Sequence, residues 1–140
     1  MTTVVKFHEV GGPEVMRFEK SEVGNPGPGQ VRLRHVAVGL NFADTYFRSG
    51  IYPVPLPSGL GNEASGVVEA VGEGVQHLKV GDRVTYTGFT NTLGAYSTER
   101  LIDAAPLIKL PDAISCEQAA AMTMRGLSAA YLCRKIYPFQ

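Results

Sequence analysis

The stretch that decides the fold runs from Gly39 to Pro53 and reads GLNFADTYFRSGIYP. It predicts a short helix over Phe42–Arg48, because Asn41 is a suitable N-cap and Gly50 a suitable C-terminal stop. Around this helix lie short β-branched runs separated by turns rich in glycine and proline. Such a pattern is typical of a mainly antiparallel sheet or barrel. The runs are Thr3–Phe7, Val31–Val38, Ala64–Val71 and Arg83–Tyr86.

A second helical region follows the predicted β-strands. Ser115 and Gln118 have the spacing of a capping box, and three alanines and a methionine then continue as helix to Met122. Apolar residues at three- and four-residue spacings predict further helix over Arg125–Tyr137. We therefore expect one mainly β domain over residues 1–124 and a connecting helix over residues 125–140.

Composition limits the class of ligand. The chain has 140 residues, 44% of them hydrophobic, and its 13 basic residues balance its 13 acidic ones. A balanced charge without like-charge runs favours neither nucleic acid nor an anionic membrane as a partner. No targeting segment or membrane span is evident, and Cys116 and Cys133 have no metal or disulfide pattern. We expect a soluble, cytoplasmic protein with reduced thiols and a small-molecule ligand.

One apparent nucleotide motif does not have the context that it needs. Residues 59–64, GLGNEA, satisfy the G-x-G-x-x-A spacing of a dinucleotide-binding loop. That loop works between a strand and a helix, whose N-terminal amides hold the phosphates. Here a proline-rich loop precedes the motif and a β-type run follows it. We therefore predict that it is not a phosphate loop.

Several blocks in order carry a family resemblance. They are GGPEV (11–15), GLNFADTYFRSGIYP (39–53), GNEASGVV (61–68), VGDRV (80–84) and GAYS (94–97). The chain resembles the N-terminal, GroES-like domain of medium-chain dehydrogenases/reductases, in the quinone oxidoreductase branch related to zeta-crystallin. The resemblance implies a mainly β fold with short helices, a partly open GroES-like barrel. It also implies that the final helix leads to a doubly wound, nucleotide-binding α/β domain that is absent from this chain.

The positions that hold catalytic zinc in related alcohol dehydrogenases carry amides here. By this resemblance Asn41 stands where those enzymes have a cysteine, and Asn62 where they have a histidine. An amide is a poor ligand for Zn²⁺ compared with either. The interval from Gly81 to Gly94 has no cysteines for a structural zinc lobe, and the three histidines are scattered. We expect no bound metal and interpret the histidines as surface or hydrogen-bonded core residues.

Without zinc the substrate must be electrophilic already, as a quinone is, and neutral hydrogen-bond donors then suffice to stabilise the developing oxyanion. Asn41, Tyr46 and Tyr52 are the candidate catalytic donors, since they flank the predicted helix and match pocket positions of the family. Asn41 can serve as an N-cap, a ligand contact or both. The two tyrosines have surface packing as an alternative role.

The resemblance also implies a set of cofactor contacts. Ser128 stands where the family often has threonine and keeps the hydroxyl. Asp44 and Glu63 match positions that support the pocket, and Arg125 is equally consistent with a solvated helix charge. The candidate cofactor-binding residues are Asn41, Phe42, Ala43, Asp44, Thr45, Tyr46, Ser128 and Tyr131.

The leading hypothesis is therefore an NADPH-dependent quinone reductase that transfers hydride without zinc. By the resemblance, the absent domain binds most of the NADPH and the full-length enzyme is a homodimer, so the chain alone should be inactive. One alternative is a zinc-free reductase of α,β-unsaturated carbonyl compounds. Another is a non-catalytic GroES-like or crystallin-type binding module.

Overall fold

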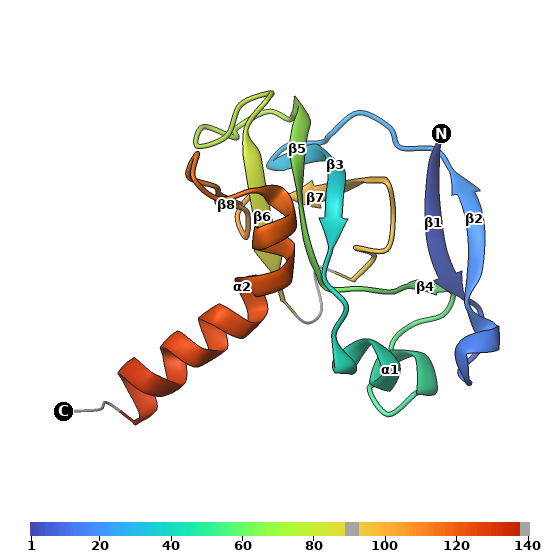
Figure 1. The fold of residues 1–140 in the computed structure, drawn as a ribbon. Coiled ribbons are helices and arrows are strands. Elements are labelled where there is room, and N and C mark those ends of the chain that lie inside the picture. The colour runs from blue at the N-terminus through green and yellow to red at the C-terminus, as the bar shows by residue number, and fades with distance from the viewer. Residues whose placement is uncertain (89–92, 138–140) are drawn as a thin grey trace.

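Two antiparallel sheets make up most of the protein in a computed structural model that describes residues 1–88 and 93–137 (Figure 1). The smaller sheet has the order β2-β1-β4 and the larger one β7-β3-β5-β6-β8. Both sheets are open, which confirms the expected mainly β, partly open fold. The strands are β1 (Thr2–Phe7), β2 (Arg17–Ser21), β3 (Gln30–Val38), β4 (Ser58–Gly59), β5 (Glu63–Val71), β6 (Arg83–Thr87), β7 (Glu99–Asp103) and β8 (Ile108–Lys109).

Helix α1 (Phe42–Ser49) lies at the predicted place and has the predicted ends. Asn41 has an extended backbone and is the N-cap, and the Asp44 carboxylate accepts the Asn41 N–H at 2.9 Å. Gly50 ends the helix with φ of 84°, a left-handed conformation that glycine adopts without a steric penalty. A single-turn 3₁₀ helix, η1 (Pro13–Val15), precedes β2.

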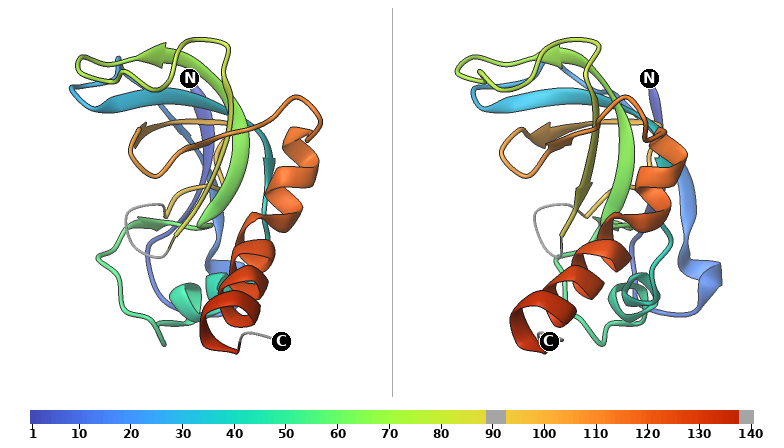
Figure 2. Two further views of the ribbon diagram at one scale, coloured as in Figure 1. Left: turned by 90° about the vertical axis from the view of Figure 1, so that its left-hand side faces the viewer. Right: turned by 60° about the vertical axis from the view of Figure 1, so that its left-hand side comes forward.

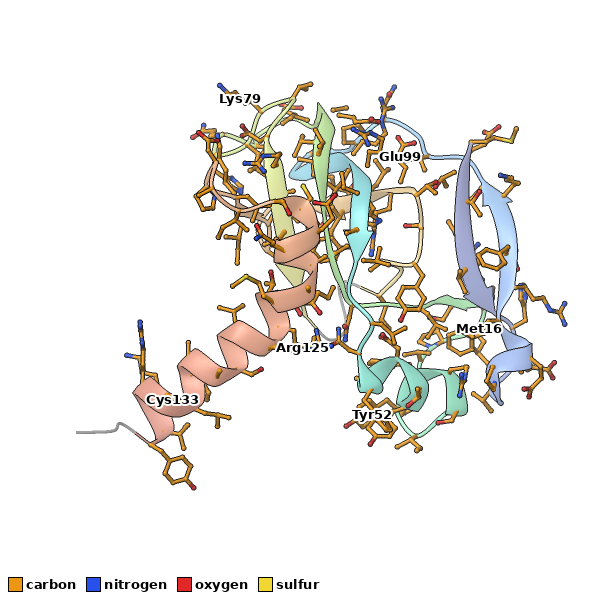
Figure 3. The ribbon with its side chains drawn as sticks, viewed as in Figure 1. Met16, Tyr52, Lys79, Glu99, Arg125 and Cys133 are labelled. Atoms are coloured by element: carbon orange, nitrogen blue, oxygen red, sulfur yellow. The ribbon has the colours of Figure 1, made fainter. Side chains whose placement is uncertain are left out.

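Helix α2 (Cys116–Tyr131) begins with the predicted capping box, since the Gln118 N–H donates to the Ser115 hydroxyl at 3.1 Å. Its first half packs on β5 and β6, and both views in Figure 2 show the helix running along the outside of the sheet. Its second half is exposed, as is Cys133 near its end (Figure 3). Both cysteines are free, and Cys116 is buried.

The two helical stretches predicted for the C-terminal region are joined in the structure. α2 is one continuous helix of 16 residues, followed by a π-helical turn, η2 (Leu132–Ile136). The boundary proposed after residue 124 therefore falls inside α2. Gly126 does not interrupt the helix, because one glycine costs only about 1 kcal/mol in a helix interior. The expected connecting helix corresponds to the second half of α2 and η2, and its residues 138–140 lie outside the described residues.

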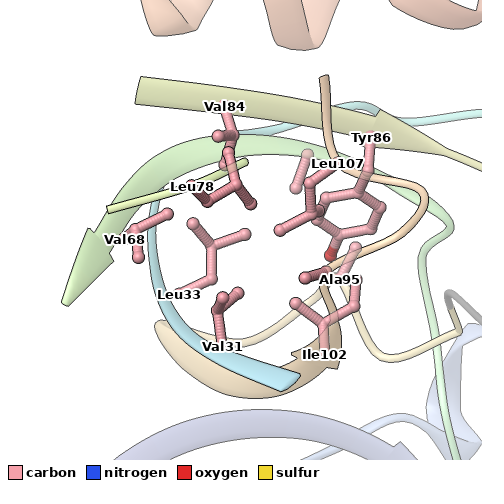
Figure 4. Packing of buried hydrophobic residues seen from close by; sticks show 11 residues of the cluster. Val31, Leu33, Val68, Leu78, Val84, Tyr86, Ala95, Ile102 and Leu107 are labelled. Carbon is pink, nitrogen blue, oxygen red and sulfur yellow. The ribbon is translucent and has the colours of Figure 1, made fainter. Parts of the chain in front are cut away.

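The main core lies inside the curve of the larger sheet. β3 and β5 pair over most of their length, with two register shifts that bend the sheet, at Glu69 of β5 and at Val36 of β3. Inward-facing side chains from β3, β5, β6 and β7 meet there (Figure 4). The buried residues are Val31, Leu33, Ala64, Val68, Leu78, Val84, Tyr86, Ala95, Ile102, Ala104 and Leu107.

His35 is a hydrogen-bonded core histidine, which is one of the two roles predicted for the histidines. Its Nδ1 lies 2.7 Å from the Ser97 carbonyl oxygen and its Nε2 3.0 Å from the Tyr86 hydroxyl. A carbonyl only accepts, so Nδ1 carries the proton and Nε2 accepts from Tyr86. Burial lowers the pKa of His35 to about 4. His35 is therefore a neutral structural residue.

The G-x-G-x-x-A spacing indeed lacks the strand-and-helix context of a phosphate loop. Gly59 ends β4 and Glu63 begins β5, so the motif connects two strands. The four predicted β-runs correspond to β1, β3, β5 and β6. The other four strands lack long β-branched runs. They are held at sheet edges by pairing with distant segments, as when Leu101 of β7 pairs with Arg32 of β3.

Candidate functional site

The candidate site is built where the start of α1 meets the start of β5. The Asn41 side chain donates from Nδ2 to Glu63 Oε2 at 2.8 Å. The other Glu63 oxygen, Oε1, accepts the backbone N–H of Met124 in α2 at 2.7 Å. Glu63 is fully buried. One carboxylate thus connects the capping residue of α1 with the middle of α2.

A second buried carboxylate lies one helical turn from Asn41. Asp44 Oδ2 accepts both the Asn41 N–H and the Tyr96 hydroxyl, the latter at 2.8 Å, while its buried Oδ1 has no hydrogen-bond partner in the part of the chain that the structure describes. Burial and the adjacent Asp44 raise the pKa of Tyr96 above its ordinary value of 10. The Tyr96 hydroxyl therefore stays a donor at neutral pH. The unused Asp44 oxygen can accept a bond from a ligand hydroxyl or amide.

Asn41, Asp44 and Tyr96 line a cavity of about 320 Å³ beside α1. That volume falls at the lower end of the range for small-molecule pockets. The cavity brings together four predicted site residues: Asn41, Phe42, Asp44 and Thr45. Its other lining residues are Met16, Leu40, Arg48, Leu60 and Tyr96.

Tyr46 and Tyr52 lie in an aromatic cluster instead. Their ring centroids are 5.4 Å apart in an edge-to-face arrangement, and Phe42 and Phe47 pack against the two ends. The Tyr52 N–H also donates to the Tyr46 carbonyl at 3.1 Å. Neither tyrosine hydroxyl has a partner within residues 1–88 and 93–137. Packing thus fixes the rings while the hydroxyls stay available as donors.

The remaining predicted residues lie elsewhere. Ala43 packs against the apolar cluster of Phe7, Val15, Phe47 and Leu60. Ser128 and Tyr131 lie on the exposed half of α2 and do not line the cavity beside α1. Arg125 is not a purely solvated charge, because its guanidinium donates to the Leu40 carbonyl at 3.1 Å. Figure 3 shows it between α2 and the segment that leads into α1.

The sequence reasoning missed the part that Tyr96 plays and gave Glu63 only a general supporting role. Glu63 carried a usable signal, because a charged residue is rarely buried without partners and Glu63 opens an apolar β-run. Tyr96 carried none. Its partner Asp44 lies 52 residues away in the chain.

Asn62 differs from Asn41 in its surroundings. It is fully buried, and neither its Oδ1 nor its Nδ2 has a hydrogen-bond partner among residues 1–88 and 93–137. Among the described residues, no three histidine, cysteine, aspartate or glutamate side chains come close enough together to hold a metal ion. In the same part of the chain, no helix has the length and apolar character needed to cross a membrane.

The open antiparallel sheets and the capped helix beside the pocket are those of a GroES-like domain. The family profile described as "Alcohol dehydrogenase GroES-like domain" matches residues 27–112, and the chain belongs to this family.

Similar proteins indicate which branch of this family the chain resembles. A quinone oxidoreductase of Pseudomonas aeruginosa is 51% identical over 98% of this chain. The crystal structure of Escherichia coli quinone oxidoreductase complexed with NADPH is 48% identical over 99% of this chain, with a TM-score of 0.93. A 2-haloacrylate reductase of Burkholderia sp. is 45% identical over 94% of it. The expected resemblance to the quinone oxidoreductase branch is thus confirmed.

The chain spans only part of these relatives. It covers 42% of the Pseudomonas enzyme, 42% of the Escherichia coli structure and 41% of the 2-haloacrylate reductase.

Proposed function

We propose that this domain forms the substrate side of an NADPH-dependent quinone reductase. The observation that carries the proposal is the arrangement around α1. Asn41 is hydrogen-bonded to a buried carboxylate, and the free hydroxyls of Tyr46 and Tyr52 lie on the same helix and the loop after it. Neutral donors of this kind suit an oxyanion that develops on an already electrophilic carbonyl. The similarity to quinone oxidoreductases supplies the substrate class.

The cavity beside α1 fits part of a nicotinamide nucleotide. Its buried Asp44 Oδ1, which no described residue bonds, suits a ribose hydroxyl or carboxamide N–H, while the exposed ring of Phe42 offers apolar contact. Asn41, Phe42, Asp44, Thr45 and Tyr46 would hold the cofactor on this side. NADPH supplies the hydride when bound. Asn41, Tyr46 and Tyr52 would orient the substrate and donate hydrogen bonds to its carbonyl oxygen.

The exposed half of α2 would complete the cofactor site against a nucleotide-binding domain. Leu127, Tyr131 and Leu132 are each about half exposed there. A partner domain would bury these apolar side chains, and Ser128 would then face the cofactor. The homodimer and the cytoplasmic location stay predictions, although the free, exposed Cys133 fits a reducing compartment.

The reaction proceeds without metal in this proposal. The Asn41 side-chain N–H already donates a hydrogen bond to Glu63, and neither Asn41 nor Asn62 offers a thiolate or imidazole to Zn²⁺. The carbonyl must therefore be activated by conjugation. This requirement selects quinones and related conjugated acceptors.

A second candidate function is the reduction of α,β-unsaturated carbonyl compounds. The similarity to 2-haloacrylate reductase favours it, and such substrates are also activated without zinc. The donors would be the same, with the negative charge developing on a carbonyl or carboxyl oxygen. The two functions differ in the shape of the acceptor rather than in the residues that bind it.

A chimera tests both functions. Residues 1–140 would replace the segment of Escherichia coli quinone oxidoreductase that they match. The remainder of that enzyme would complete the chimera. We expect NADPH oxidation by this chimera to be faster with 1,4-naphthoquinone than with methyl vinyl ketone. Faster turnover of the enone would favour the second function. A folded chimera that reduces neither compound would contradict both.

A further inference from the structure

We infer that Glu63 is a positioning residue that fixes the orientation of the Asn41 amide and makes that orientation depend on α2. This inference rests on the proposed function, in which Asn41 donates to a ligand oxygen. Glu63 itself lies behind Asn41 and is fully buried, so it acts through the amide rather than on a substrate.

The bonding pattern permits one orientation of the amide. The Met124 N–H can only donate, so it occupies Glu63 Oε1, and Oε2 is left to accept from Asn41 Nδ2. The other end of the amide, Oδ1, makes no cap bond to the helix, because the Asp44 N–H donates to the Asn41 backbone carbonyl oxygen at 3.0 Å. A flipped amide would face the Glu63 carboxylate with its oxygen, so two acceptors would meet. The second Nδ2 hydrogen is then the one left for a ligand.

Close packing holds the carboxylate in place. A Cβ added at Gly39 would overlap Glu63 Oε2 and lie 2.8 Å from the Ala120 carbonyl oxygen. The Gly39 N–H also donates to the Glu63 carbonyl at 2.8 Å. Glycine is therefore required where the end of β3 passes between β5 and α2. The buried Glu63 carboxylate is therefore packed against the backbone at Gly39.

Helix α2 contacts the residues on both sides of this arrangement. Met124 bonds to Glu63, and the next residue, Arg125, donates to the Leu40 carbonyl, one residue before Asn41. A shift of α2 would thus move the Asn41 amide. The helix that would face a nucleotide-binding domain is in this way connected to the group that would face the substrate.

Two substitutions and their combination test the inference. In Glu63→Gln, the introduced amide must offer its oxygen to the Met124 N–H and its nitrogen to Asn41, so two donors meet and the Asn41 amide turns over. In Asn41→Asp, two carboxylates meet. The double variant restores the hydrogen bond with its direction reversed and keeps the net charge, but no side-chain N–H remains at position 41.

The first readout uses the 140-residue chain. In its ¹H–¹⁵N spectrum, we expect one Asn41 side-chain proton to be shifted downfield and slow to exchange, and to lose both properties in Glu63→Gln. Each single variant should lower Tm, and the double variant should recover most of the loss. The matched control is Glu69→Gln, also on β5, whose carboxylate pairs with Arg34 at the surface. An Asn41 signal unaffected by Glu63→Gln would overturn the assigned orientation.

The second readout is turnover in the chimera. We expect Glu63→Gln to lower kcat by about 100-fold, at the lower end of the range found for lost oriented donors, with a smaller change in KM. The double variant should regain Tm but not kcat. Unchanged kcat in Glu63→Gln despite a lowered Tm would reduce Glu63 to a purely structural residue. Full recovery of kcat in the double variant would overturn the donor role of Asn41.

Failure of the proposed function has a different signature. An inactive unsubstituted chimera would contradict quinone reduction, while the amide spectrum and the Tm values of the 140-residue chain would still decide the orientation of Asn41.

Discussion

The Tyr96 hydroxyl donates a hydrogen bond of 2.8 Å to Asp44 Oδ2, joining the segment before β7 to helix α1. The same carboxylate oxygen accepts the Asn41 N–H that begins the helix. Tyr96 therefore supports the position of the candidate site without belonging to α1. Because burial and Asp44 raise the pKa of Tyr96, this bond persists through neutral pH and is lost only well above pH 10.

Replacement of Tyr96 by phenylalanine should destabilise the fold. The variant leaves a buried carboxylate with one donor fewer, and we expect it to lower the free energy of unfolding by about 1–3 kcal/mol. Urea unfolding of the 140-residue chain followed by circular dichroism measures this change. Tyr137→Phe is the matched control, because Tyr137 is 70% exposed. Equal stability of the two variants would contradict the supporting role of Tyr96.

How much of the site was predictable depends on how far apart its partners lie in the sequence. Asn41, Gly50 and Ser115 were identified correctly as helix ends, because capping depends on residues within one turn. The bond between Glu63 and Met124 joins residues 61 positions apart, and one sequence gives no register for such a contact. The same holds for β2, whose mostly polar residues 17–21 form a strand by pairing with β1. Helix ends could be predicted from neighbouring residues, whereas contacts between distant segments could not.

Stability should fall with acid because of His35. Its pKa is lowered from 6.5 to about 4 in the folded state, so between these values the unfolded chain binds more protons. The contribution of neutral His35 is complete above about pH 6.5 and is lost as the pH falls toward 4. Its slope reaches at most about 1.4 kcal/mol per pH unit.

Urea unfolding at several pH values between 4 and 7 measures this slope. We expect His35→Gln to have a shallower dependence than the unsubstituted chain, since glutamine does not titrate. His77→Gln controls for the removal of an exposed histidine. Identical slopes for the unsubstituted chain and His35→Gln would show that other groups cause the acid sensitivity.

Removal of the Tyr52 hydroxyl should affect turnover rather than folding. In Tyr52→Phe the ring keeps its edge-to-face contacts with Tyr46 and Phe47, and no hydrogen bond of the described residues is lost. We expect kcat of the chimera to fall by about 100-fold, as for a lost oxyanion donor, with Tm unchanged within about 1 °C. Tyr137→Phe again serves as the control. Unchanged kinetics would leave Tyr52 with a packing role only.

The purified chain should not retain stoichiometric zinc. Asn41 and Asn62 replace the two ligand types that Zn²⁺ prefers, and the Asn41 nitrogen is already bonded to Glu63. Elemental analysis after expression with added zinc and extensive dialysis measures the metal content. One equivalent of zinc per chain would contradict the metal-free mechanism.

NADPH should bind weakly to the 140-residue chain by itself. The glycine-rich residues 59–64 connect two strands and present no helix N-terminus, and both α-helices carry an acidic residue in the first turn, Asp44 and Glu117. These carboxylates oppose an approaching pyrophosphate at the helix ends that would otherwise attract it.

Calorimetry should show no saturation up to about 1 mM NADPH, a binding free energy weaker than about 4 kcal/mol. The chimera should bind it far more tightly, because the remainder of the Escherichia coli enzyme comes from a protein seen in complex with NADPH. Tight binding to the chain alone would mean that the cavity beside α1 holds more of the nucleotide than its nicotinamide end.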